Sequence, residues 1–162
     1  SIGLGALVMR DTEHDAKRQL GLVAYILQGL GKLFGFQPWR FTIDTDGKQS
    51  HMRASEIAIV NAGALGVAGM RWGEHIYIDD GQIDVCIVNA RSILDYIRLA
   101  WESWRGTEER DPATQYLKAK DRVVVNSRRH LPAQGDGEYI GHTPVEVQVI
   151  PAALRVITPP EK

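Results

Sequence analysis

The sequence predicts an α+β fold, mainly β, in which an antiparallel β-sandwich-like domain carries two principal helices. After Pro38, short segments rich in β-branched and apolar residues follow one another closely, separated by tight turns. Only two segments show the three- and four-residue apolar spacing of a helix. Short connections suit antiparallel strands, whereas parallel strands need long crossovers, so we do not expect a doubly wound parallel sheet.

Residues 14–34 form the first predicted helix. Apolar residues cover one face at helical spacing, and a second apolar stripe covers much of the remaining girth. A membrane span needs about 20 apolar residues, and this shorter run is interrupted by Gln28, Lys32 and glycines. We therefore expect a helix buried on both faces. Contact of one face with lipid or with a neighbouring domain is the alternative.

Three strands are predicted in the middle of the chain. Arg40–Asp44 alternates polar and apolar residues, and the hairpin signal Asp46-Gly47 follows it. Ile57–Val60 is an apolar run typical of a second strand. The third strand, Ile83–Val88, follows the turn Asp79-Asp80-Gly81.

Residues 91–104 form the second predicted helix, with Ser92 as its N-cap. Its apolar stripe includes Trp101 and Trp104, for which we expect core packing. Contact with a membrane surface is the alternative, because tryptophan favours the interface between lipid and water. Further strands are predicted at 122–126, around Glu138, at 145–150 and at 154–157.

Composition restricts the class of protein. A single domain of 162 residues can bury a core without disulfides. The 19 basic and 20 acidic residues lack the basic excess of a nucleic-acid-binding protein. The sole cysteine, Cys86, lies in an apolar run and is expected to be a buried hydrophobic residue. The chain shows neither an initial Met nor a signal peptide, so we expect a cytoplasmic fragment of a longer protein.

Several common catalytic and cofactor motifs are missing from the sequence. The opening Gly3-Leu4-Gly5 lacks the third glycine of a dinucleotide fingerprint, since position 8 is Val8. There is no P-loop lysine motif, protein-kinase glycine loop or nucleophile elbow. None of the five histidines has a partner at zinc-ligand spacing.

Two acidic turns are the remaining candidate sites. The turn around Asp80 is either a solvated turn or a magnesium site built from a carboxylate and main-chain carbonyls. The turn Gly135–Glu138 is either a plain hairpin turn or a support that presents Glu138 to a cleft as a general base. Phosphoryl transfer to an alcohol needs both a base and a cation, which two turns on one sheet could supply.

These segments, in this order, resemble the C-terminal half of the bacterial diacylglycerol kinase and sphingosine kinase-like family. The similarity covers nearly the whole chain. The segments that carry it are Lys17–Gly21, Asn61–Gly63, Ile78–Gly81, Tyr116–Ala119, which is expected to precede a strand, Asp136–Glu138 and Ile150–Val156.

The resemblance implies a lipid kinase that transfers the γ-phosphoryl group of ATP to a lipid hydroxyl, such as that of diacylglycerol. It implies that Glu138 accepts the hydroxyl proton. Asp80 would bind Mg²⁺ together with the main-chain carbonyls of Tyr77 and Gln82. Asp136 would order its turn and join the water network around the metal.

In this family a Gly-Gly-Asp-Gly-Thr-type loop of an N-terminal domain binds the nucleotide, and this chain has no such loop. The resemblance therefore implies that residues 1–162 are a single C-terminal domain, inactive alone, whose partners are a lipid alcohol and its own N-terminal domain. Peripheral membrane contact and a homodimer stay open, and nucleic acid is not expected. Two alternatives remain: a non-catalytic module that binds lipid or protein, and a kinase of the same fold that acts on a non-lipid alcohol.

Overall fold

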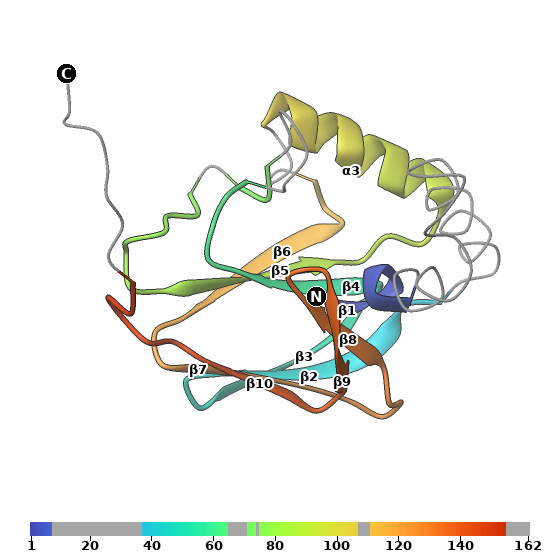
Figure 1. Cartoon of the computed structure of the whole chain (residues 1–162). Helices are drawn as coiled ribbons and strands as arrows, with labels where there is room; N and C mark the ends of the chain where they lie inside the picture. Colours follow the sequence, from blue (N-terminus) through green and yellow to red (C-terminus); the bar gives the residue numbers. More distant parts are fainter. Residues whose placement is uncertain (8–36, 65–70, 74, 107–110, 155–162) are drawn as a thin grey trace, which may run out of the picture.

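The structure, a computed structural model, describes residues 1–7, 37–64, 71–73, 75–106 and 111–154. In these residues, two antiparallel sheets pack against each other, and a long helix covers the outer face of the larger sheet (Figure 1). Residues 4–7 are also helical. The mainly β, sandwich-like α+β fold predicted from the sequence is confirmed.

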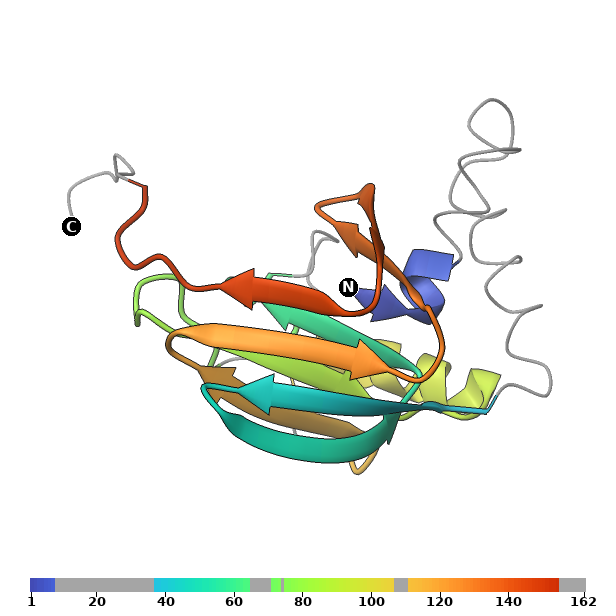
Figure 2. The same ribbon diagram turned by 90° about the horizontal axis from the view of Figure 1, so that it is seen from below.

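The larger sheet has six strands in the order β6-β5-β4-β1-β8-β9. Their bounds are β1 (Ile2–Gly3), β4 (Glu56–Val60), β5 (Ile83–Val88), β6 (Thr114–Ala119), β8 (Pro132–Gly135) and β9 (Glu138–His142). The smaller sheet has four strands in the order β10-β7-β2-β3, which lie side by side in Figure 2. Their bounds are β2 (Trp39–Thr45), β3 (Lys48–Ala54), β7 (Arg122–Ser127) and β10 (Val145–Gln148).

The β2–β3 hairpin forms at the predicted turn. Asp46 and Gly47 have φ angles of 53° and 87°, and two positive φ values in a two-residue loop match the twist of the flanking strands. The Asp46 carboxylate also accepts hydrogen bonds from the main-chain N–H groups of Lys120, Asp121 and Arg122 at 2.7 to 3.0 Å. These three donors lower the pKa of Asp46 and join the β2–β3 turn to the β6–β7 turn.

The main core lies between the two sheets, and strand β5 shows how the sequence builds it. Successive side chains of a strand point to opposite faces. Val85 and Ile87 accordingly face the smaller sheet and pack with residues such as Ile43 and Val123. Cys86 faces the other way and is buried on the side of the helix, as its apolar surroundings predicted. The larger sheet is therefore apolar on both faces along β5.

The long helix α3 (Ile93–Arg105) has the predicted N-cap. The Ser92 side chain accepts the N–H of Asp95, and the Asp95 carboxylate accepts the N–H of Ser92, which completes a capping box. Gly106 ends the helix in the left-handed region, with φ of 69°. Among the described residues, no helix is long and apolar enough to span a bilayer.

The structure corrects several details of the sequence prediction. Residues 116–119 belong to strand β6 itself, although they were expected only to precede a strand. The strand predicted at 145–150 ends at Gln148. Leu154, expected to open a last strand, lies outside any strand, and the rest of that segment lies beyond the described residues. The helix predicted at 14–34 also lies outside the described residues.

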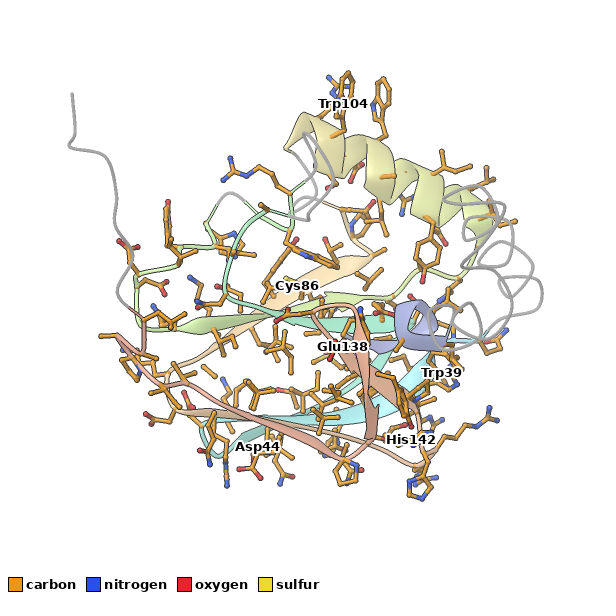
Figure 3. The ribbon with its side chains drawn as sticks, viewed as in Figure 1. Trp39, Asp44, Cys86, Trp104, Glu138 and His142 are labelled. Carbon is orange, nitrogen blue, oxygen red and sulfur yellow. The ribbon has the colours of Figure 1, made fainter. Side chains whose placement is uncertain are left out.

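Trp101 and Trp104 are not core residues. Their side chains are 54% and 60% exposed on α3, and Figure 3 shows Trp104 pointing away from the sheets. The prediction of core packing was therefore wrong for both.

Candidate functional site

Glu138 opens strand β9 directly after a two-residue turn. Asp136 and Gly137 have φ angles of 48° and 87°, a conformation that aspartate and glycine adopt most readily. The turn is fixed further because the Gly137 N–H donates to the Gln134 side-chain oxygen at 3.1 Å. Glu138 pairs with Gly135 across the hairpin and is exposed (Figure 3). The carboxylate is thus presented to solvent by a tightly defined backbone.

Asp136 has a different position from Glu138. It lies on the wall of a cavity of about 160 Å³ at one end of the space between the sheets. Gly135 and Ile140 of the same hairpin also line this cavity, together with Ile83 from the start of β5. Both carboxylates of the hairpin are therefore exposed, and Asp136 in addition lines the cavity.

Asp80 occupies an exposed turn just before β5. Its Oδ1 accepts the main-chain N–H of Gln82 at 2.9 Å. Its Oδ2 accepts the side-chain amide Nε2 of Gln82 at 3.4 Å. Tyr77 is 58% exposed and lies before the same turn. The three residues predicted to share a magnesium site are therefore close along one turn, and the side chain of Gln82 contacts Asp80 directly.

A lysine stands beside this turn, and the sequence analysis missed it. The Lys118 ammonium, from β6, lies 3.6 Å from Asp80 Oδ2 and 3.8 Å from Oδ1 of Asp84, and it donates to the His75 carbonyl at 3.4 Å. The Asp84 side chain is only 1% exposed. Burial raises the pKa of Asp84, while Lys118 and His75 oppose that shift. Lys118 therefore supplies positive charge to two carboxylates.

The Asp80 carboxylate is the acidic group of the predicted magnesium site, and its oxygens already have other partners. Oδ2 of Asp80 accepts the side-chain amide of Gln82 at 3.4 Å, and exposure of the turn allows water to reach the same oxygen. Lys118 is a competing cation at the same oxygen. In the part of the chain that the structure describes, no group of three or more His, Cys, Asp or Glu side chains is arranged to hold a metal ion.

The two acidic turns lie on one sheet but not at one point. Since β5 and β9 run in the same direction, both turns lie at the same end of the larger sheet. Three strands, β4, β1 and β8, separate them in the strand order. Each strand spacing is about 4.8 Å. The two turns are thus not neighbours in the strand order, although Ile83 at the start of β5 and Asp136 line one cavity.

An apolar cavity of about 220 Å³ lies between α3 and the larger sheet, and the sequence analysis did not predict it. Tyr96 and Leu99 of α3 line one side, and Cys86, Val88 and Tyr116 line the sheet side. Figure 3 shows Cys86 on the larger sheet below the helix. The cavity joins side chains from strands far apart in the sequence, so no local pattern indicates it. The cavity-lining residues of α3 were recognisable in the sequence only as apolar positions of an amphipathic helix.

Glu56 is a buried carboxylate in this cavity wall. Glu56 is 9% exposed, and its Oε2 accepts the main-chain N–H of Gly5 at 2.7 Å. Burial raises the pKa of Glu56 above its ordinary value of 4.5, against the opposing effect of the Gly5 N–H. In the sequence, the only sign of this buried carboxylate is a charged residue at the start of the apolar strand Glu56–Val60.

We expect the stability of the chain to fall as pH rises from about 4.5 towards neutrality, because of Glu56. A carboxyl whose folded pKa is raised stabilises the fold below its unfolded pKa, and this contribution is lost as pH rises through the folded pKa. Glu56→Gln keeps the shape and an acceptor for Gly5 but cannot ionise. The melting temperature of this variant should fall less over that interval than that of wild type. Parallel pH profiles would contradict the assignment.

The fold and the cavity define the class of this protein as an antiparallel β-sandwich-like domain with an apolar cavity under one helix. Within that class, the family described as the YegS C-terminal NAD kinase beta sandwich-like domain matches residues 1–158. The chain belongs to this family, the C-terminal domain of the diacylglycerol kinase and YegS lipid kinases. This confirms the family suggested by the sequence motifs.

Individual relatives agree with this assignment. The diacylglycerol kinase of Bacillus subtilis (strain 168) is 30% identical over 155 residues, which are 94% of this chain and 50% of that protein. A protein of Shewanella frigidimarina named "Probable lipid kinase YegS-like" is 27% identical over 98% of this chain and 50% of its own length. The chain thus spans about half the length of these curated relatives.

A solved structure shows the same fold. The crystal structure of a diacylglycerol kinase from Bacillus anthracis str. Sterne aligns with a TM-score of 0.55 at 17% identity. The alignment covers 75% of this chain and 43% of the other.

Proposed function

We propose that this chain is the substrate-binding half of a lipid kinase that transfers the γ-phosphoryl group of ATP to the hydroxyl of a diacylglycerol-like lipid. An N-terminal domain of the same protein would bind ATP. The observation that carries the proposal is the apolar cavity under α3, in a domain that belongs to a lipid kinase family. Its lining is mainly aliphatic and aromatic, as expected for a site that binds hydrocarbon.

The cavity would hold part of one acyl chain. Its volume of about 220 Å³ is below the roughly 300–1,000 Å³ of sites that enclose a whole drug-sized ligand. Each methylene transferred from water contributes about 0.8 kcal/mol. Binding of a few methylenes would therefore fix the lipid while its headgroup and hydroxyl remain outside the cavity.

Glu138 would act as the general base. As the lipid oxygen attacks the γ-phosphorus, its proton passes to the Glu138 carboxylate, the bond from the γ-phosphorus to the bridging oxygen breaks, and ADP leaves. The exposed position of Glu138 on a fixed turn supports this role, because a partner domain can bring the reacting groups to it. Asp136, on the cavity wall, would order the turn and its water.

Magnesium, when bound at the Asp80 turn, would supply a positive charge that orders this loop. Asp80 Oδ2 and the main-chain carbonyls of Tyr77 and Gln82 would hold it, with water as the remaining ligands. Because three strands separate this turn from Glu138, we assign the ion a structural role. Any magnesium that accompanies ATP would be a separate ion.

We predict that removing Lys118 strengthens magnesium binding. Lys118→Met deletes a charge 3.6 Å from Asp80 Oδ2, and affinity should rise about 2- to 5-fold, the range expected of an exposed ion pair. Asp80→Asn should abolish binding, whereas Asp79→Asn, a matched change in the same turn, should have little effect. Titration calorimetry of the chain with MgCl₂ measures all three. Equal affinities in wild type and Asp80→Asn would mean that Asp80 is only a turn residue.

A further inference from the structure

The outward face of α3 is apolar and exposed. Leu94, Ile97, Trp101 and Trp104, which we call the α3 outer face, are 76%, 59%, 54% and 60% exposed. Their spacing of three and four residues places them on one side of the helix. Isolated apolar residues are common on surfaces, but a contiguous patch with two tryptophans indicates a binding surface.

The body of the protein fixes this orientation. On the inward side, the Tyr96 hydroxyl donates to the Ser55 hydroxyl at 2.9 Å, and the Ser103 hydroxyl donates to the Arg71 carbonyl at 2.6 Å. Arg98 binds the buried Asp111 carboxylate through two contacts of 2.6 and 3.1 Å. Turning the outer face inward would break these bonds, so its exposure is a stable property of the fold.

Two exposed arginines flank this face in the described residues. Arg105 lies at the end of α3 and Arg91 just before its cap, and both are exposed, whereas the Arg98 guanidinium is paired with Asp111. The two acidic residues of the helix, Asp95 and Glu102, are partly buried, and Asp95 is bound within the capping box. Arg105 also lies 5.9 Å from the Trp101 ring centre.

We infer that the α3 outer face docks the domain onto an anionic lipid bilayer, with α3 lying along the surface. Tryptophan and aliphatic side chains would enter the interface, and the flanking arginines would meet lipid phosphates. The same helix lines the apolar cavity with Tyr96 and Leu99. Docking would therefore hold the cavity beside the bilayer that contains the lipid substrate. The statement that the bilayer contains the substrate rests on the proposed function.

Vesicle binding tests the inference directly. The chain is sedimented with vesicles of phosphatidylglycerol and phosphatidylcholine in equal parts, and with phosphatidylcholine alone. Wild type should bind the anionic vesicles, and Trp101→Ala/Trp104→Ala should bind them at least about 10-fold more weakly. Its melting temperature should stay near that of wild type, since both side chains are exposed. Ile150→Ala/Leu154→Ala, which removes other exposed apolar side chains, is the matched control and should bind like wild type.

Other outcomes identify other occupants and overturn the inference. A dimer in sedimentation velocity that the double tryptophan variant loses, without vesicle binding, would assign the face to a second copy. Vesicle binding by the chain that disappears in the two-domain protein would assign it to the N-terminal domain. Equal vesicle binding by wild type and the tryptophan variant would exclude α3 as the contact. Loss of phosphoryl transfer to a water-soluble, short-chain diacylglycerol bears only on the proposed function, because that substrate needs no bilayer.

Discussion

Glu138→Gln in the two-domain enzyme should lower kcat by roughly 10²-fold or more. The substitution keeps the size of the side chain and removes the oxygen that accepts the hydroxyl proton. A lipid hydroxyl is a poor nucleophile until a base takes its proton, and a positioned base typically contributes about 10²–10⁴-fold. Folding and ATP binding should change little, because Glu138 is exposed and begins a strand whose turn is fixed by Asp136 and Gly137.

The measurement is steady-state phosphorylation of a short-chain diacylglycerol, with melting temperature as the control for folding. Glu146→Gln is the matched variant, since Glu146 is an exposed glutamate on β10 that pairs with Arg122. It should retain normal turnover. If Glu138→Gln were as active as Glu146→Gln, Glu138 would be an ordinary turn residue, and the non-catalytic lipid-binding module would become the better explanation. The chain alone should show no turnover with ATP, as its lack of a nucleotide-binding loop predicts.

Local signals in the sequence predicted local structure well. Asp46-Gly47 and Asp136-Gly137 each form a turn with two positive φ angles, because aspartate followed by glycine favours that conformation. Ser92 caps α3, because its side chain can accept an N–H that the first turn leaves unpaired. The two acidic turns themselves follow from such signals, and the family resemblance added their expected roles.

Features that depend on distant segments were not predictable. Strand β6 carries alternating polar and partly buried residues, and only pairing with β5 makes Thr114–Ala119 a strand. The stripe of Trp101 and Trp104 indicated which residues share a face of α3, but periodicity does not decide which face meets the sheet. Tyr96, Arg98 and Ser103 decide it through polar contacts to other elements. For the same reason the sequence indicated neither the Lys118 cluster nor the cavity at Glu56.

Filling the cavity under α3 should impair phosphorylation of long-chain lipids selectively. Leu99→Trp places a larger ring among cavity-lining residues, and the displaced acyl segment loses about 0.8 kcal/mol per methylene. Expelling two to three methylenes should lower kcat/KM by about 10- to 100-fold. The loss should appear with dioctanoylglycerol and disappear with dibutyrylglycerol, whose chains are too short to use the cavity.

Leu94→Trp is the matched control for this change, because it makes the same substitution in the same helix at a position that is 76% exposed. It should leave the chain-length preference unchanged. If Leu99→Trp unfolds the protein, Cys86→Phe enters the cavity from the opposite wall, on β5, and tests the same space. A folded Leu99→Trp or Cys86→Phe variant with unchanged preference for long chains would show that the acyl chain binds elsewhere. Selective loss in both would assign this cavity to the acyl chain, because the two substitutions approach it from different elements and share only the space between them.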